Sequence, residues 1–258
     1  MVPAHAHPRP KANPLSDDPF AHHPELRDKI AAPEASFFRD FSFEGMIERF
    51  PEMAVHRDWP HRDDAREALR AAALSGHSGD LWVFGYGSLM WDPALHFSEV
   101  RRAYLPDYER KMMLVEWRGA RGTAEAPGLM AALDTGHGCE GLAFRIAADL
   151  VDTETRILFR REMLAPAYLA RMVPVELDDE PVQALTFVAD HAVPDMRADI
   201  AREEQIRYIA HGAGFLGTSR DYLANIVAHF EALGIEDADC ESLLRDVDEY
   251  LSAKAQSA

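Results

Sequence analysis

Cysteine is scarce in this sequence: Cys139 and Cys240 are the only two among 258 residues. They lie far apart, outside any C-x-x-C or zinc-ligand spacing, so neither a disulfide framework nor a cysteine metal site is expected. We therefore expect reduced thiols in a reducing compartment. The sequence also lacks a run of about 18 apolar residues and the apolar core of a signal peptide. These absences predict a cytoplasmic protein with no membrane-spanning segment.

Basic residues are also few compared with acidic ones. The chain has 27 Lys and Arg against 44 Asp and Glu, a formal net charge of −17. Binding to nucleic acid or to an anionic membrane surface needs clustered Lys and Arg, so we expect neither as a partner. Apolar residues make up 47 % of the chain, enough for a sizeable core. The excess acid is explained by solubility alone.

Signatures of metal and nucleotide binding are missing too. The N-terminal histidines have no cysteine or carboxylate framework around them, which argues against a metal site; they are His5, His7, His22 and His23. Gly85 and Gly87 form a G-x-G, but Met90 stands where a dinucleotide loop needs its third glycine, and no Walker lysine follows. We therefore expect neither a metal site nor a nucleotide-binding loop.

Composition divides the chain into three parts. Residues 1–35 are rich in Pro, His and Ala and predict a disordered tail. Residues 36–79 form an N-terminal extension with many large apolar side chains, which we expect to lie on the domain surface or on a protein partner. Those side chains are Phe37, Phe38, Phe41, Phe43, Met46, Ile47 and Phe50. The main domain is predicted over residues 80–258.

The main domain predicts an α+β fold, a small mixed β-barrel with one central helix and helices after it. Short apolar runs separated by Pro and Gly predict the strands: Leu81–Phe84, Val100–Leu105, Arg110–Glu116, Leu129–Asp134, Glu140–Ile146, Leu169–Leu177 and Val182–Ala189. The central helix is expected from a cap at Asp149 to about Met163. Later helices are expected over 200–210, from a Thr218 capping box to Gly234, and over 239–251. Strands and helices do not alternate regularly along the chain, so we do not expect a dinucleotide-binding fold.

One candidate site is the turn from Gly85 to Leu89. Glycines directly after a buried strand let the backbone turn sharply and point several N–H groups in one direction. Such a concavity binds a carboxylate or a developing oxyanion. The same two glycines are equally compatible with a tight turn that binds nothing.

The second candidate is Glu162. Val151, Thr155, Leu158 and Glu162 share one stripe of the predicted helix, and this stripe should face the core. The neighbouring Arg156, Arg160 and Arg161 are expected on its solvated face. Desolvation would raise the pKa of a carboxyl placed there toward neutrality, as an acid/base requires. A glutamate bonded to an arginine or an amide explains the pattern equally simply, and in an arbitrary helix more commonly.

Several segments, in order, resemble the ChaC-type γ-glutamylcyclotransferases. The opening segment Trp82–Trp91, with the letters W-V-F-G-Y-G-S-L-M-W, resembles the family's first motif. Later matches are Arg121-Gly122-Thr123 with Pro127-Gly128-Leu129, then Gly138–Phe144, the pair Arg161-Glu162, and Gly217–Leu223. The resemblance covers roughly residues 80–250, and its order makes it specific.

The resemblance implies a fold, an activity and a site. The family's fold is a small mixed barrel with helices, and its members convert glutathione to 5-oxoproline and Cys-Gly without metal or cofactor. Carried over, the loop Tyr86-Gly87-Ser88-Leu89 binds the γ-glutamyl group and Glu162 is the acid/base. Arg121 is a candidate partner for a substrate carboxylate, with a strand-edge salt bridge as the alternative. Tyr222 is a candidate pocket residue, with a buried core aromatic as the alternative.

The segment Met163–Tyr168 departs from the family pattern, in which a Lys and then Gly-Gly-Tyr often follow the R-E pair. This departure affects the expected shape of the pocket, and therefore which leaving group the pocket accepts. Two other functions remain open at this point. One is a cyclotransferase acting on other γ-glutamyl amino acids or amines. The other is a non-catalytic regulatory protein that uses the same cavity.

Overall fold

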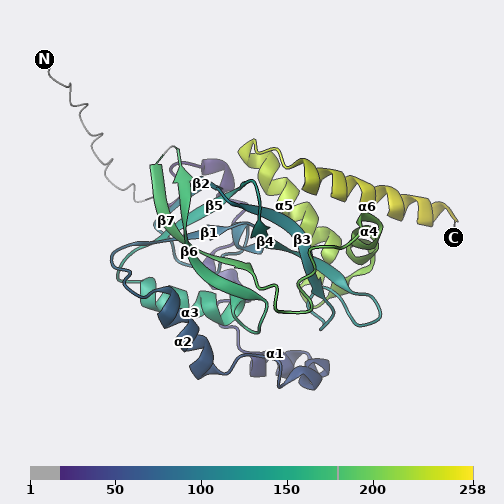
Figure 1. Cartoon of the computed structure of the whole chain (residues 1–258), viewed down its shortest axis with the longest axis horizontal. Coiled ribbons are helices and arrows are strands. Elements are labelled where there is room, and N and C mark those ends of the chain that lie inside the picture. Colours follow the sequence, from purple (N-terminus) through teal and green to yellow (C-terminus); the bar gives the residue numbers. More distant parts are fainter. Residues whose placement is uncertain (1–17, 179, 258) are drawn as a thin grey trace, which may run out of the picture.

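A closed, mixed β-barrel forms the centre of the computed structural model, which describes residues 18–178 and 180–257 (Figure 1). Its five strands follow the order β1-β5-β2-β6-β7, and a parallel pairing of β1 with β7 closes the ring. The bounds are β1 Leu81–Gly85, β2 Glu99–Leu105, β5 Cys139–Ile146, β6 Tyr168–Leu177 and β7 Glu180–Ala189. Two further strands, β3 Tyr108–Glu116 and β4 Gly128–Thr135, extend the sheet from β7. The predicted α+β barrel is confirmed.

The apolar runs that predict the strands are buried as expected. Val83 and Phe84 of β1 are both fully buried, so this strand packs on both of its faces and shows no polar alternation. Phe144 and Phe187 are fully buried on strands β5 and β7. Strand β1 and the turn after it are therefore held firmly by the core.

Helices cover two sides of the sheet. Figure 1 shows α2 (Asp63–Ala73) and α3 (Val151–Glu162) on one side, with α4 (Arg202–His211), α5 (Ser219–Leu233) and α6 (Ala238–Ser257) on the other. Helix α5 begins at the predicted cap, where Thr218 accepts a hydrogen bond from the Asp221 amide, and ends at Gly234 with a φ of 62°. The expected cap at Asp149 is wrong, because α3 begins after Leu150 without a side-chain cap. No helix in the described ranges is long and apolar enough to cross a membrane.

The predicted disordered tail is wrong for residues 18–35, while residues 1–17 lie outside the described part. Leu26 is fully buried and Ile30 is 7 % exposed, and both belong to the main core cluster. The amide of Ala31 donates to the carbonyl of Trp91 at 2.8 Å. Two short 3-10 helices, Pro24–Leu26 and Pro33–Ala35, organise the segment. The sequence did not predict this ordered packing, because isolated apolar residues among prolines show neither helical nor strand periodicity.

Residues 36–61 also pack against the domain, close to α3. This segment contains helix α1 (Phe43–Arg49) and a 3-10 helix at Pro51–His56. Arg39 makes a two-bond ion pair with Glu154 of α3, whose side chain is 1 % exposed. Farther along, the amide of His61 donates to the carbonyl of Leu164 at 2.7 Å. The extension is therefore attached to the domain near both ends of α3. The domain surface is one of the two locations expected from the sequence.

We expect Arg39→Met to destabilise the protein by about 3 kcal/mol, because it leaves the buried Glu154 carboxylate without its cation. Denaturant unfolding would measure this loss. Arg202→Met, which removes a half-exposed pair with Asp246, is the control and should cost less than about 1 kcal/mol. Equal losses in the two variants would contradict the importance of the buried pair.

Candidate active site

Glu162 is the last residue of α3, and its side chain is 14 % exposed. Burial raises the pKa of its carboxyl above the usual 4.5, while the charge and hydrogen bond of Arg161 oppose this rise. The Nε of Arg161 lies 2.8 Å from a Glu162 carboxylate oxygen. The result is a desolvated carboxyl that has a single cationic partner among the described residues, as a proton-transfer group requires.

Arg161 does not lie on a solvated face, contrary to the expectation from the helix stripe. Its side chain is 5 % exposed, because the loop after β1 and the N-terminal extension cover this flank of α3. One nitrogen donates to the Ser88 hydroxyl at 2.7 Å and another donates to the Asp92 carbonyl. The guanidinium carbon lies 4.1 Å from the centre of the Phe38 ring. Arg161 thus joins the helix end, the glycine loop and the extension.

The predicted glycine turn follows β1 directly and enters a short 3-10 helix, Ser88–Met90. Gly87 is required by a close approach: a Cβ there would lie 2.5 Å from the phenol oxygen of Tyr222. At the start of the 3-10 helix, the amides of Ser88 and Leu89 have no intrahelical acceptor. The turn therefore presents backbone donors next to an aromatic wall, which suits an anionic or carbonyl oxygen.

A single cavity of ≈ 440 Å³ brings together all seven residues predicted for the site. They come from the loop after β1, the end of α3, the segment before β4 and the first turn of α5. Those residues are Tyr86, Gly87, Ser88, Leu89, Arg121, Glu162 and Tyr222. Segments far apart in the sequence thus converge where the barrel meets α3 and α5.

The phenols in this cavity are neutral. Burial raises the pKa of Tyr222 to about 12 and that of Tyr86 well above its usual range. Tyr86 donates to the Phe187 carbonyl at 2.9 Å, so its side chain is tied into the barrel. Tyr222 accepts a weak bond from the Ala131 amide at 3.4 Å. Tyr222 therefore lines the cavity and packs in the core at once.

Arg121 forms no salt bridge within the described ranges, so the strand-edge alternative is wrong there. Its guanidinium lies 4.9 Å from the centre of the Tyr222 ring and donates to the carbonyls of Leu216 and Thr218. Burial lowers its pKa, although an arginine remains a cation at neutral pH. A partly buried cation whose described partners are neutral carbonyls and an aromatic ring is suited to a carboxylate ligand.

Several lining residues were not predicted from the sequence. Tyr168, at the start of β6, is partly buried, desolvation raises the pKa of its phenol well above the usual value, and it lines the same cavity. Asp92 also lines the cavity, and its Oδ1 is buried without a hydrogen-bond partner in the described part of the chain. Phe37 and Phe38 come from the extension. The one available signal was position: Asp92 and Tyr168 lie three and six residues beyond the two predicted sites.

Both cysteines pack in the main core cluster. Both are free and buried, and burial raises the pKa of Cys139 to about 11 and that of Cys240 to about 12. Thiols with such values are poor nucleophiles at neutral pH. Across residues 18–178 and 180–257, no three His, Cys, Asp or Glu side chains are grouped as metal ligands.

A family model described as ChaC-like protein matches residues 81–250. The chain belongs to the ChaC-like family. It is 34 % identical over 195 residues to the glutathione-specific γ-glutamylcyclotransferase of Escherichia coli K12, covering 75 % of this chain and 84 % of that protein. The human glutathione-specific γ-glutamylcyclotransferase 1 is 30 % identical over 180 residues, covering 66 % of this chain and 79 % of that protein.

The fold of this ChaC-like chain also matches a solved structure. A yeast γ-glutamyl cyclotransferase specific to glutathione superposes with a TM-score of 0.62 at 18 % identity. The match covers 67 % of this chain and 97 % of the yeast chain. The γ-glutamylcyclotransferase-like barrel predicted from the sequence is therefore confirmed. The family match begins at residue 81. Phe37 and Phe38, which line the cavity, therefore belong to a segment that the family match does not cover.

In this ChaC-like chain we expect Gly87→Ala to lower the free energy of unfolding by about 2 kcal/mol, because the new methyl group overlaps the Tyr222 oxygen. Adding Tyr222→Phe should recover most of the loss, since the ring carbon behind that oxygen lies 3.6 Å away. A double-mutant cycle by denaturant unfolding would measure the coupling. Simple additivity of the two changes would show that the close approach is not the reason for the glycine.

Proposed function

We propose that this chain is a γ-glutamylcyclotransferase that cleaves glutathione to 5-oxoproline and Cys-Gly. The observation that carries the proposal is the buried Glu162 carboxyl facing the Gly87–Ser88 turn in one cavity. The names of the relatives support the same substrate. A general acid/base beside backbone donors is the machinery that this reaction needs.

The proposed reaction is an intramolecular acyl transfer. The α-amine of the glutamyl group attacks its own γ-carbonyl, a C–N bond forms, and the C–N bond to the cysteinyl nitrogen breaks. The α-ammonium first loses a proton to the Glu162 carboxylate. That proton then goes to the departing amine. The attacking nitrogen loses a second proton as the lactam forms, and the released Cys-Gly amine takes one up to become an ammonium. Because attacker and target belong to one molecule, holding the glutamyl chain curled supplies a large part of the rate.

The other residues are proposed to bind and orient the glutamyl group. Backbone amides in the Tyr86–Leu89 loop donate to the developing oxyanion or to the glutamyl carboxylate. Arg121 takes a substrate carboxylate, which supplies the anionic partner that it lacks among the described residues. The unpartnered Asp92 oxygen accepts from the α-ammonium. Tyr222 closes the wall behind Gly87.

The two alternatives predict different sites. A non-catalytic binding protein has no use for a desolvated carboxyl whose pKa is raised, since burying it costs stability. A cyclotransferase for other γ-glutamyl amines would keep the glutamyl end and differ at the leaving-group end. Product formation from glutathione and from γ-glutamyl dipeptides separates the two substrates. A protein partner for residues 36–79 stays a proposal, although apolar side chains of this segment pack on the domain itself.

We expect the purified protein to form 5-oxoproline and Cys-Gly from reduced glutathione, and Glu162→Gln to lower kcat by about 10²–10⁴-fold. Mass spectrometry of both products measures this. The variant should unfold at the same or a higher temperature at pH 7. A carboxyl whose pKa is raised on folding weakens the folded state once the pH exceeds its unfolded pKa, and the amide removes that cost.

Glu180→Gln is the matched control, because Glu180 is exposed at the start of β7. It should retain full turnover. Near wild-type turnover by Glu162→Gln would refute the assignment of Glu162. Absence of both products in the wild type would refute glutathione as the substrate.

The pH profile gives a separate check on Glu162. Activity needs the carboxylate form, so kcat/KM should fall as the pH drops through an apparent pKa above 4.5. Arg161→Met should move this acid limb to higher pH, because Arg161 is the group that opposes the effect of burial. Arg161→Lys keeps a charge and should move the limb less. An acid limb at the same pH in all three proteins would contradict the coupling.

A further inference from the structure

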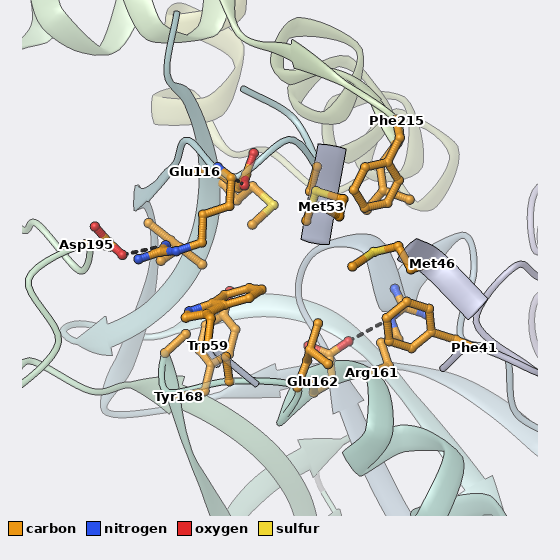
Figure 2. Close-up of a pocket in the computed structure, with 18 of the residues that line it drawn as sticks. Phe41, Met46, Met53, Trp59, Glu116, Arg161, Glu162, Tyr168, Asp195 and Phe215 are labelled. Atoms are coloured by element: carbon orange, nitrogen blue, oxygen red, sulfur yellow. Dashed lines mark hydrogen bonds and ion pairs between the residues drawn. The ribbon is translucent and has the colours of Figure 1, made fainter. Parts of the chain in front are cut away.

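A second cavity, of ≈ 160 Å³, lies beside Glu162 and is walled on one side by the N-terminal extension. Figure 2 shows Glu162 and Tyr168 across this cavity from Met46 and Met53. Trp59 of the extension and Phe215 also line it. Its wall next to α3 is formed by residues 164–168. We call it the apolar cavity.

The apolar cavity shares one wall with the ≈ 440 Å³ cavity of the candidate active site, here called the site cavity. Glu162, Arg161 and Tyr168 line both, whereas Gly87 and Ser88 line only the site cavity. A substrate whose glutamyl group lies against the glycine loop has its scissile amide at Glu162. What remains of the substrate then extends away from the loop, toward the apolar cavity. The two cavities therefore correspond to the two sides of the bond that is cleaved.

The charges around the apolar cavity already have partners. Arg118 lies 2.7 Å from the carboxylate of Asp195 and stacks over the Trp59 ring at 4.9 Å. The Glu116 carboxylate accepts from the amides of Arg118 and Arg121 at 2.7 and 2.6 Å. Arg161 and Glu162, which also line the cavity, pair with each other at 2.8 Å. The rest of the described lining is aliphatic, aromatic or thioether. An additional charged group would have to be desolvated there without a new partner, so the cavity suits an apolar occupant.

Its volume sets the size of that occupant. A dry apolar cavity of about 150 Å³ is known to bind benzene. We propose that the apolar cavity takes an apolar substituent, about as large as one benzene ring, carried by the leaving amine of a γ-glutamyl amide. This inference rests on the proposed cyclotransferase function. In the glutathione skeleton the substituent is an S-linked one, and S-benzylglutathione is the probe of this class.

Binding to the inactive Glu162→Gln variant of the full chain tests the cavity without relying on turnover. Titration calorimetry with S-benzylglutathione should give a Kd at least about tenfold lower than that with glutathione, because the ring leaves water for an apolar cavity. A third ligand, γ-glutamylphenylalanine, carries the same ring without the thioether. A tenfold advantage for either ring-bearing ligand supports the cavity, and the tighter of the two shows which linkage places the ring there better.

Variants of Met53 change the cavity in opposite directions. In the Glu162→Gln background, Met53→Trp fills the space and should reduce the S-benzyl advantage over glutathione to about twofold or less. Met53→Ala enlarges the space and should shift the preference toward S-(naphthylmethyl)glutathione. Val55→Ala is the matched control, since Val55 lies on the same short helix and is 82 % exposed. It should leave the ratio of the dissociation constants unchanged.

The outcomes separate this inference from the proposed function. Equal Kd values for the ring-bearing ligands and glutathione, or a ratio insensitive to both Met53 variants, would overturn the cavity assignment. Wild-type turnover of glutathione is measured in parallel. If the wild type forms no 5-oxoproline but the Kd ratio holds, the proposed reaction on glutathione falls and the apolar cavity stands.

Discussion

The contacts of the Arg161 guanidinium hold the site together. It pairs with Glu162, donates to the Ser88 hydroxyl and packs on the Phe38 ring. These three residues belong to a helix end, a loop after a strand and the N-terminal extension, so one cation fixes the relative positions of three segments. Arginine suits this role because its planar fork donates in several directions and stacks on aromatic rings. The same charge limits how far burial can raise the Glu162 pKa.

The extension depends on a second buried pair. Arg39 and Glu154 tie residues 36–61 to the helix that carries Glu162, and Arg160 adds a hydrogen bond to the Arg39 carbonyl at 2.7 Å. Such a pair is costly to break, because one buried charge would be left without its partner. The aromatic side chains of the extension are thereby held over the site. A segment outside the family match thus forms part of the wall where the leaving group is expected.

Local sequence patterns predicted the strands and helix ends whose structure depends mainly on neighbouring residues. The apolar runs predicted the strands, the Thr218 cap predicted the start of α5, and the helix stripe predicted the inward direction of Glu162. Arg161 was misplaced because a helix stripe describes one helix and says nothing about what covers its flanks. The order at Leu26 and the location of Phe38 depend on contacts between distant segments, which no spacing in the sequence encodes.

The site also resolves a conflict between the charge of the chain and that of its proposed substrate. Glutathione is an anion at neutral pH, and the chain carries a net charge of −17. At physiological ionic strength, charges separated by more than about 8 Å are largely screened from each other, so the distant surface acids contribute little at the cavity. Arg121 and Arg161 lie in the cavity wall, partly withdrawn from solvent, where screening is weak and a charge acts strongly. The local field at the bound ligand is therefore set by these two arginines against Glu162 and Asp92. In the proposed function, the zwitterionic γ-glutamyl group is accommodated on an acidic protein because its α-carboxylate meets an arginine and its α-ammonium meets a carboxylate.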